Sequence, residues 1–204
     1  MQNTISYNIL TNSKTRAITS STDATPIVVT TADDHGLATG DQITIFGHTT
    51  NVAANGRWTI TKTLAAAFSL DGSVGSGAGA GADGTYTAAA PKWIFCKDFE
   101  TIKFTFDTDG GGDCAVTVKA AISFQDEAPD FAKAKSATNQ YDYVDIIDLE
   151  DGASIDGDTG VAVSGADDNR HFEVNANGAK WFTIIPTAGT AGEITVTCTL
   201  FERN

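Results

Sequence analysis

The chain is poor in several features that mark common protein classes. Its 204 residues include 4 prolines, 1 methionine and 3 cysteines, and they contain no long uninterrupted apolar run. Residues 1–16, MQNTISYNILTNSKTR, lack a continuous apolar core, so we expect neither a signal peptide nor a membrane span there. No segment of helical period is long enough to anchor a helical fold, which leaves an all-β protein as the expected class.

The cysteines are odd in number and far apart, at Cys96, Cys114 and Cys198, and each lies in an apolar, strand-like run. The sequence has neither a CxxC pair nor histidines and cysteines at metal-ligand spacing. This pattern argues against structural zinc and against a disulfide scaffold. We therefore expect buried thiols, no cofactor, and synthesis in a reducing cytoplasm.

Basic residues are also scarce, with 13 Lys and Arg against 26 Asp and Glu, for a formal net charge of −13. The deficit is uneven, because residues 1–90 carry a net charge of −2 and residues 91–204 a net charge of −11. An acidic surface repels phosphate backbones, and no basic patch is visible, so a nucleic-acid partner is not expected. Solubility explains the acidic second half without any special ligand.

What the chain does have is glycine-punctuated alternation, clearest in residues 35–72, HGLATGDQITIFGHTTNVAANGRWTITKTLAAAFSLDG. Ile43 and Ile45 alternate with polar residues, and Trp58 and Ile60 do the same. The Asn55-Gly56 dipeptide between them predicts a two-residue type I′ hairpin turn. A small β-barrel-like module over residues 16–90 is therefore expected, with a glycine-rich end.

The order HGLATGD, an I-x-I-x-G strand, AANGRWTIT and FSLDGSVGSGA resembles a small β module that recurs in head and tail proteins of tailed bacteriophages. The resemblance covers roughly residues 17–85 and implies a virion structural protein. The GSGAGAGADG run, residues 75–84, departs from that pattern. The composition of residues 72–91 predicts a linker or a long surface loop, and we place the boundary between two domains there.

Residues 91–204 show seven or eight short strands separated by turns, which favours an acidic antiparallel β-sandwich or jelly roll. The clearest alternation is ITVTCTL, residues 194–200. We expect a hairpin formed by residues 101–107 and the CAVTVKAAISF run, and another hairpin turn at Asn177-Gly178. One short helix is allowed over residues 128–138. The segments FQDEAPDF, NQYDYVDIIDLEDG and EVNANGAKWFTIIP resemble virion β domains of phages.

The N-terminal residues 1–15 form a polar arm in which Ile5, Tyr7 and Ile9 alternate with polar residues. Two interpretations stay open. The segment is either an arm that adds a strand to a neighbouring subunit or an ordinary first strand of its own chain.

Candidate chemistry is sparse. Two acidic loops resemble fragments of a calcium loop, but neither is followed by a bidentate glutamate, and Asp and Gly also form ordinary turns, which is the expected role. The histidines lie apart and beside no nucleophile elbow, so no enzyme is expected and no catalytic, cofactor-binding or metal residue is assigned. The residues concerned are Asp107, Asp109 and Asp113; Asp151, Asp156 and Asp158; and His35, His48 and His171.

The aromatic residues allow a sugar-stacking platform, formed from Trp58, Trp93, Trp181, Tyr141 and Tyr143. Trp58 shares a strand face with Ile60, and Trp181 shares one with Ile185, so packing in a core is the favoured role of the tryptophans.

These observations predict a noncatalytic structural protein of a tailed-phage virion, assembled in the host cytoplasm. The favoured role is a capsid decoration, or cement, protein that binds the major capsid protein or other virion proteins. Fold analogy suggests a homotrimer. The alternative is a tail, fibre or adaptor component, with host carbohydrate as a further ligand.

Overall fold

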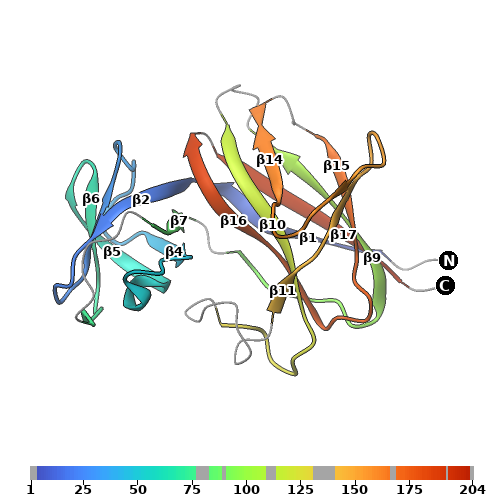
Figure 1. Ribbon diagram of the computed structural model, residues 1–204, viewed down its shortest axis with the longest axis horizontal. Helices are drawn as coiled ribbons and strands as arrows, with labels where there is room; N and C mark the ends of the chain where they lie inside the picture. The colour runs from blue at the N-terminus through green and yellow to red at the C-terminus, as the bar shows by residue number, and fades with distance from the viewer. Residues whose placement is uncertain are drawn as a thin grey trace.

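In the computed structural model the chain forms two β bodies, a closed barrel and a two-sheet sandwich (Figure 1). The structure describes residues 4–76, 83–88, 91–108, 114–130, 141–165, 169–191 and 193–202. Within these residues helical structure is slight: η1 (Val52–Ala54) is a short 3-10 turn, Gly165 also has a 3-10 conformation, and no helix is long and apolar enough to cross a membrane. The all-β class, with a small barrel and antiparallel sheets, is confirmed.

The barrel closes in the order β2-β3-β6-β5-β4-β7. It forms because each strand turns one apolar face inward. Ile43 and Ile45 of β4 and Ile60 of β5 are all fully buried. The strands are β2 (Thr15–Ser21), β3 (Val28–Thr31), β4 (Gln42–Phe46), β5 (Gly56–Leu64), β6 (Ala67–Leu70) and β7 (Thr85–Thr87).

The expected two-residue turn at Asn55-Gly56 is wrong. Strands β4 and β5 do pair, with Ile45 opposite Gly56, but residues 47–55 form the connection and include η1. Asn55 has extended backbone angles, so it does not occupy a type I′ turn. Its side chain is used instead to hold the loop, as described below.

The larger sheet of the sandwich has six strands in the order β1-β17-β9-β15-β12-β13. Ile194, Val196, Cys198 and Leu200 of β17 alternate inward along its centre, as the sequence predicts. The strands are β1 (Thr4–Ser13), β17 (Ile194–Glu202), β9 (Phe99–Asp107), β15 (His171–Asn175), β12 (Ile146–Asp148) and β13 (Ser154–Ile155).

The smaller sheet runs β11-β10-β16-β8, with β14 also paired to β10. Val116 and Val118 of β10 and Phe182 and Ile184 of β16 point into the core shared with the larger sheet. The strands are β11 (Tyr141–Tyr143), β10 (Ala115–Ser123), β16 (Trp181–Ala191), β8 (Ile94–Phe95) and β14 (Val161–Ser164). The jelly-roll connectivity stays a prediction.

Two predicted hairpins of the sandwich are wrong. β9 lies in the six-stranded sheet and β10 in the five-stranded sheet, so these two strands do not pair with each other. Asn177 and Gly178 do form a tight turn with positive φ, but that turn joins β15 to β16, which also belong to different sheets. Local turn chemistry is the same for a hairpin and for a crossover, so the sequence does not separate them. The helix allowed over residues 128–138 falls largely outside the described residues.

The N-terminal segment is a strand of its own chain. β1 pairs with β17, with Thr4 opposite Phe201, so both described ends lie side by side in the sandwich, at the end away from the barrel (Figure 1). Lys14 alone separates β1 from β2, and the chain therefore passes straight from one body into the other. The Lys14 ammonium also lies 3.1 Å from the Glu193 carboxylate, and Thr85 Oγ1 donates to the Thr187 carbonyl at 2.6 Å. These contacts join barrel and sandwich.

Candidate functional site

The acidic loops act as turns where the structure describes them. Asp151 Oδ1 accepts a hydrogen bond from the amide of Ala153 at 2.8 Å, and Asp156 Oδ1 accepts from the amides of Asp158 and Thr159. Asp109 and Asp113 lie outside the described residues, and Asp107 ends β9 on its exposed side. No cluster of three potential metal ligands occurs in the described ranges.

The three histidines have different surroundings in the fold. His35 is buried in the barrel, where its Nδ1 accepts from the Leu37 amide and its Nε2 faces the carbonyls of Leu64 and Ala67. The ring also packs edge-on against Phe68. His171 is exposed on β15 and contacts the Thr105 hydroxyl at 2.7 Å. Both arrangements are structural.

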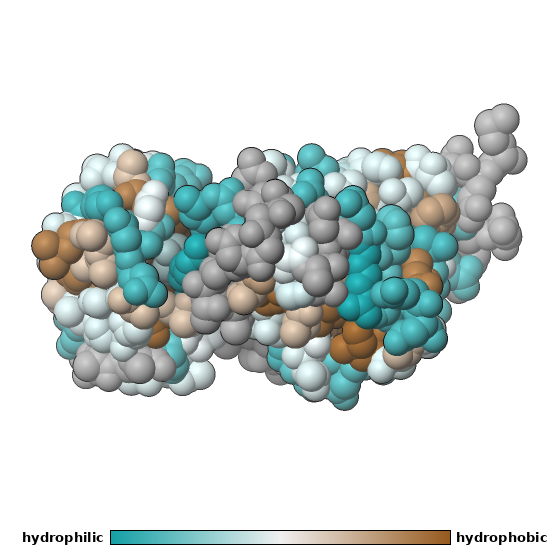
Figure 2. All heavy atoms as spheres, turned by 90° about the horizontal axis from the view of Figure 1, so that it is seen from above, coloured by the Kyte–Doolittle hydropathy of each residue, from teal (hydrophilic) through white to brown (hydrophobic). Residues whose placement is uncertain are grey.

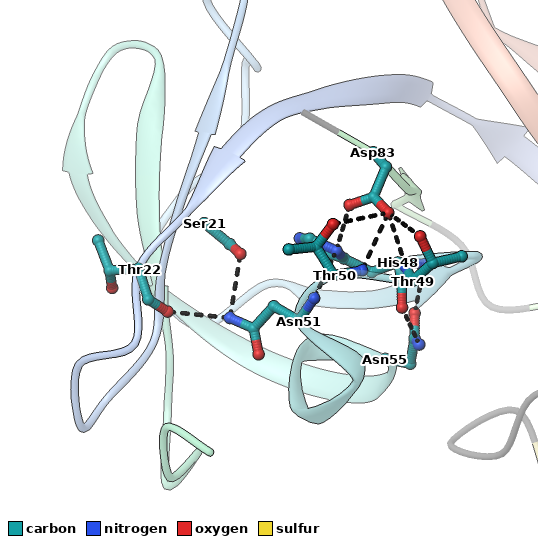
Figure 3. A network of polar contacts seen from close by, with 8 residues as sticks. All are labelled: Ser21, Thr22, His48, Thr49, Thr50, Asn51, Asn55 and Asp83. Carbon is teal, nitrogen blue, oxygen red and sulfur yellow. Dashed lines mark hydrogen bonds and ion pairs between the residues drawn. The ribbon is translucent and has the colours of Figure 1, made fainter. Parts of the chain in front are cut away.

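His48 belongs to a polar network at one end of the barrel (Figure 3). Its Nδ1 lies 2.6 Å from Asp83 Oδ1. The second Asp83 oxygen accepts hydrogen bonds from the Thr49 amide at 2.8 Å, the Thr50 amide at 3.0 Å and the Thr49 hydroxyl. One carboxylate before β7 therefore closes the loop that follows β4.

Asparagines complete this network. The amides of Asn55 and His48 bond reciprocally, because His48 N donates to Asn55 Oδ1 and Asn55 Nδ2 donates to the His48 carbonyl, each at 2.9 Å. Asn51 Nδ2 donates to Ser21 Oγ and to the Thr22 carbonyl, which ties the same loop to the end of β2. Figure 3 shows both asparagines below the imidazole.

His48 Nδ1 lies between two groups of opposite character. It is 2.6 Å from Asp83 Oδ1, and it accepts a hydrogen bond from the Asn51 amide at 3.2 Å. Burial lowers the pKa of His48 below its ordinary 6.5, an effect that Asp83 offsets in part. Burial raises the pKa of Asp83, but hydrogen bonds from Thr49 and Thr50 outweigh it and hold that pKa below 3.8.

The His48–Asp83 pair resembles the histidine and aspartate of a nucleophile–histidine–aspartate triad, but the described residues place no nucleophile next to His48 Nε2. The His48 side chain is 0% exposed, and its Nε2 meets no hydrogen-bond partner within the described part of the chain. A general base must reach the proton that it removes. The network therefore fixes the loop that follows β4.

A row of residues that includes several aromatic side chains lies on the side of the five-stranded sheet that faces away from the core. Ser123 pairs with Tyr141 on one side and with Trp181 on the other, and Trp181 pairs with Phe95. Residues directly opposite in antiparallel strands share a face. The neighbouring residues Ile94, Ile122 and Phe182 point into the core, so this row points away from it.

The aromatic residues on this side form two groups of ring contacts, which we together call the aromatic face and define as Trp93, Phe95, Tyr141, Tyr143 and Trp181. The ring centroids are 5.6 Å apart for Trp93 and Tyr141 and 6.1 Å for Tyr141 and Tyr143 in one group, and 5.3 Å for Phe95 and Trp181 in the other. Ser123 and Thr183, on the same side of the sheet, are almost completely buried.

The edge of the aromatic face is polar. Lys119 Nζ lies 4.7 Å from the centroid of the Tyr143 ring, a cation–π contact. Burial raises the pKa of Tyr143, and a hydrogen bond with Tyr141 reduces that shift. Trp181 Nε1 donates to the Gln125 carbonyl at 3.1 Å, and Lys180 pairs with Asp126 nearby. Apolar rings with charged neighbours are typical of a surface that binds another molecule.

The aromatic face corrects the expected role of Trp181. Trp58 packs against the barrel core, as predicted, with its Nε1 bonded to the Ala54 carbonyl. Trp181 belongs to neither core and lies outward with Phe95, which is 48% exposed. The sequence did place Trp181 on one face with Ile185, but alternation alone does not say which face is inside. Space filling shows apolar patches among hydrophilic residues on the sandwich lobe (Figure 2).

Comparison with known proteins gives weak structural neighbours. No protein-family model matches the chain, and no curated protein matches it. The crystal structure of PBSX exported protein XepA has a TM-score of 0.40 and 8% identity, and the match covers 97% of this chain and 86% of that chain. The crystal structure of SPBc2 prophage-derived protein YomS has a TM-score of 0.39 and 8% identity, covering 55% and 80%.

Proposed function

We propose that this chain is a noncatalytic structural protein of a tailed-phage particle, and that it binds the particle through the aromatic face. The phage assignment rests on the resemblance of residues 17–85 and 93–204 to virion β domains. The observation that carries the binding role is the outward row of Tyr141, Trp181 and Phe95.

Phe95 is 48% exposed and the other four rings of the aromatic face are half-buried, so part of their apolar area is left in water. Each removes a large apolar area from solvent when it is covered, and Trp and Tyr dominate the energetics of many protein interfaces. The two hydrophobic cores are filled by other side chains, so the aromatic face is not needed to complete them. A partner protein that covers it would gain binding energy without unfolding either body.

Within this class the proposed role is capsid decoration, with the major capsid protein as partner. The net charge of −11 on residues 91–204 suits a surface that faces solution and resists nonspecific association. A tail or adaptor position is the rival, and it predicts the same aromatic contact on a different part of the particle.

Rebinding to particles tests the proposal. Particles of the encoding phage that lack this protein are mixed with purified protein, and the bound copies are counted against concentration. We expect saturable binding that Phe95→Ser weakens roughly tenfold. Leu64→Ser is the matched control, because Leu64 is a 69% exposed apolar residue of the barrel, outside the aromatic face. Absence of binding, or equal losses for the two variants, would contradict the proposal.

Saccharide binding is a second candidate, favoured by the position of Trp181 and Tyr141 outside the core. Aromatic rings at a surface can stack on the apolar face of a sugar ring. A panel of host-surface glycans separates the two candidates. Glycan binding that Phe95→Ser abolishes, together with unchanged rebinding to particles, would favour the receptor-binding role.

A further inference from the structure

The edge of the six-stranded sheet has an unusual composition. β1 (Thr4–Ser13), TISYNILTNS, holds ten residues without a charge and without a proline. Natural sheets protect long edges with lysine, proline or irregular strands, because an open edge offers unpaired amides and carbonyls to other chains. β1 carries irregularities in register after Asn8, but its first part, Thr4 to Asn8, pairs regularly with β17.

On its other side β1 meets no strand among the described residues. Its first half is also uncovered on the side that faces the core. Ile5 lies opposite Leu200 and Tyr7 lies opposite Cys198, both of which are buried, yet Ile5 is 43% and Tyr7 37% exposed. The facing sheet ends at β8, a strand of two residues, and burial of β1 begins at Ile9. An apolar strip therefore borders an open strand edge.

We propose that β1 pairs with β1 of a second copy of this chain, antiparallel and about a two-fold axis at Ser6. In this register Ser6 faces the partner's Ser6, and Ile5 faces the partner's Tyr7. The two-fold axis produces the contact between Ile5 and Tyr7 twice. Two Ile5 and two Tyr7 side chains therefore cover one another on the core-facing side of the sheet. Thr4, Ser6 and Asn8 lie on the opposite side of the sheet, where polar residues are suited to water.

The pattern of β1 selects a second copy as the occupant, because exposed Ile5 and Tyr7 flank Ser6 and match each other in an antiparallel pair. The absence of charge on this strand selects it as the place of contact. Two molecules that each carry a net charge of −13 repel, so they are expected to meet where charge is absent. The opposite edge, β13 (Ser154–Ile155), has two residues and stands between Asp151 and Asp156. It is too short to continue the sheet, which favours a two-fold pair over the threefold assembly that fold analogy suggests. The inference does not depend on the proposed function.

Cross-linking tests the register. Opposite residues in antiparallel strands have Cα atoms about 4.5–5.5 Å apart, within the limit of about 7 Å for a disulfide. Ser6→Cys is therefore expected to form a covalent dimer under mild oxidation. Thr4→Cys is the matched control on the same side of the strand, because its two copies would lie about 13 Å apart. The native cysteines are buried and do not compete.

Sedimentation over a range of concentrations tests the association itself. The full chain is expected to form a dimer, and Ile5→Lys is expected to raise its dissociation constant at least about tenfold, because it places a charge in the contact. Leu64→Lys, on the exposed barrel surface, should leave the constant unchanged, and circular dichroism checks that both variants stay folded. A monomer at all concentrations, a dimer insensitive to Ile5→Lys, or equal cross-linking of the two cysteine variants would overturn the inference.

Discussion

The Nδ1 atom of His48 lies 2.6 Å from the Oδ1 atom of Asp83, across the open end of the barrel. The pair joins residues that are 35 positions apart in the sequence, one after β4 and one before β7. Because β7 pairs with both β2 and β4, this contact stands beside the strand that closes the barrel. The network of Figure 3 is therefore expected to contribute to barrel stability.

Removing the Asp83 carboxylate should destabilise the barrel. Asp83→Ala leaves the amides of Thr49 and Thr50 and the His48 imidazole without their acceptor. We expect the free energy of unfolding to fall by about 1–3 kcal/mol, measured in urea. Asp71→Ala is the control, since it removes an exposed carboxylate of the same body with no such bonds. Equal effects of the two substitutions would contradict the role of the network.

The same pair predicts loss of barrel stability in acid. The pKa of His48 is lower in the folded protein than the ordinary 6.5 of the unfolded chain. At a pH between the folded and the unfolded pKa, the unfolded chain therefore binds more protons than the folded protein. The free energy of unfolding is expected to fall as the pH drops through 6.5. The folded pKa of Asp83 lies below 3.8, so its contribution is present above that value and is lost as the pH falls further. His48→Gln should flatten the first part of the profile of melting temperature against pH. An unchanged slope between pH 7 and pH 5 would refute this assignment.

The thiols should be inert in the folded protein. Cys96, Cys114 and Cys198 are buried, and burial raises the pKa of Cys96 and of Cys198 to about 12. The reactive thiolate is therefore both rare and inaccessible. A chromogenic disulfide reagent at pH 8 should detect none of the cysteines in native protein and all 3 after unfolding in guanidinium. Rapid native labelling of any one would count against the packing described.

The phenylalanine cluster should dominate the sandwich core. Phe104 stacks on Phe172 with ring centroids 5.5 Å apart and also contacts Phe106 and Phe182. Phe104→Ala should cost about 3–5 kcal/mol, because it removes a large side chain and leaves a cavity. Phe95→Ala, on the aromatic face, should change stability far less. Chemical denaturation of both variants gives the comparison, and similar losses would contradict the division between core and surface.

Strand type and core side were predictable where alternation is long and unbroken. Ile194, Val196, Cys198 and Leu200 could be placed inward because threonines at the positions between them show the opposite preference. Pairing was harder, because β9 and β10 each have an inward apolar face whether they are neighbours or cross the core. The sequence holds no local signal for that choice.

The aromatic face was the least predictable part of the molecule. Trp181 and Phe182 are adjacent and both apolar, so the smaller sheet is apolar on both sides at that point and the pattern does not identify the outer one. The position of β1 depends on pairing with β17, nearly 200 residues away, which local sequence does not encode. The His48–Asp83 contact likewise joins a loop to a segment beyond two intervening strands. One signal was available for it, the presence of Asn55 and Asn51 around a loop rich in hydrogen-bonding side chains.

We propose that this chain is a structural part of a phage particle and contacts its neighbour through the aromatic face. Electron cryomicroscopy of purified particles of the encoding phage would show that contact. We expect density for a small barrel joined to a two-sheet sandwich, with Phe95 and Trp181 turned toward an adjoining virion protein. Particles without this protein, or a bound protein whose aromatic face points into solvent, would contradict it.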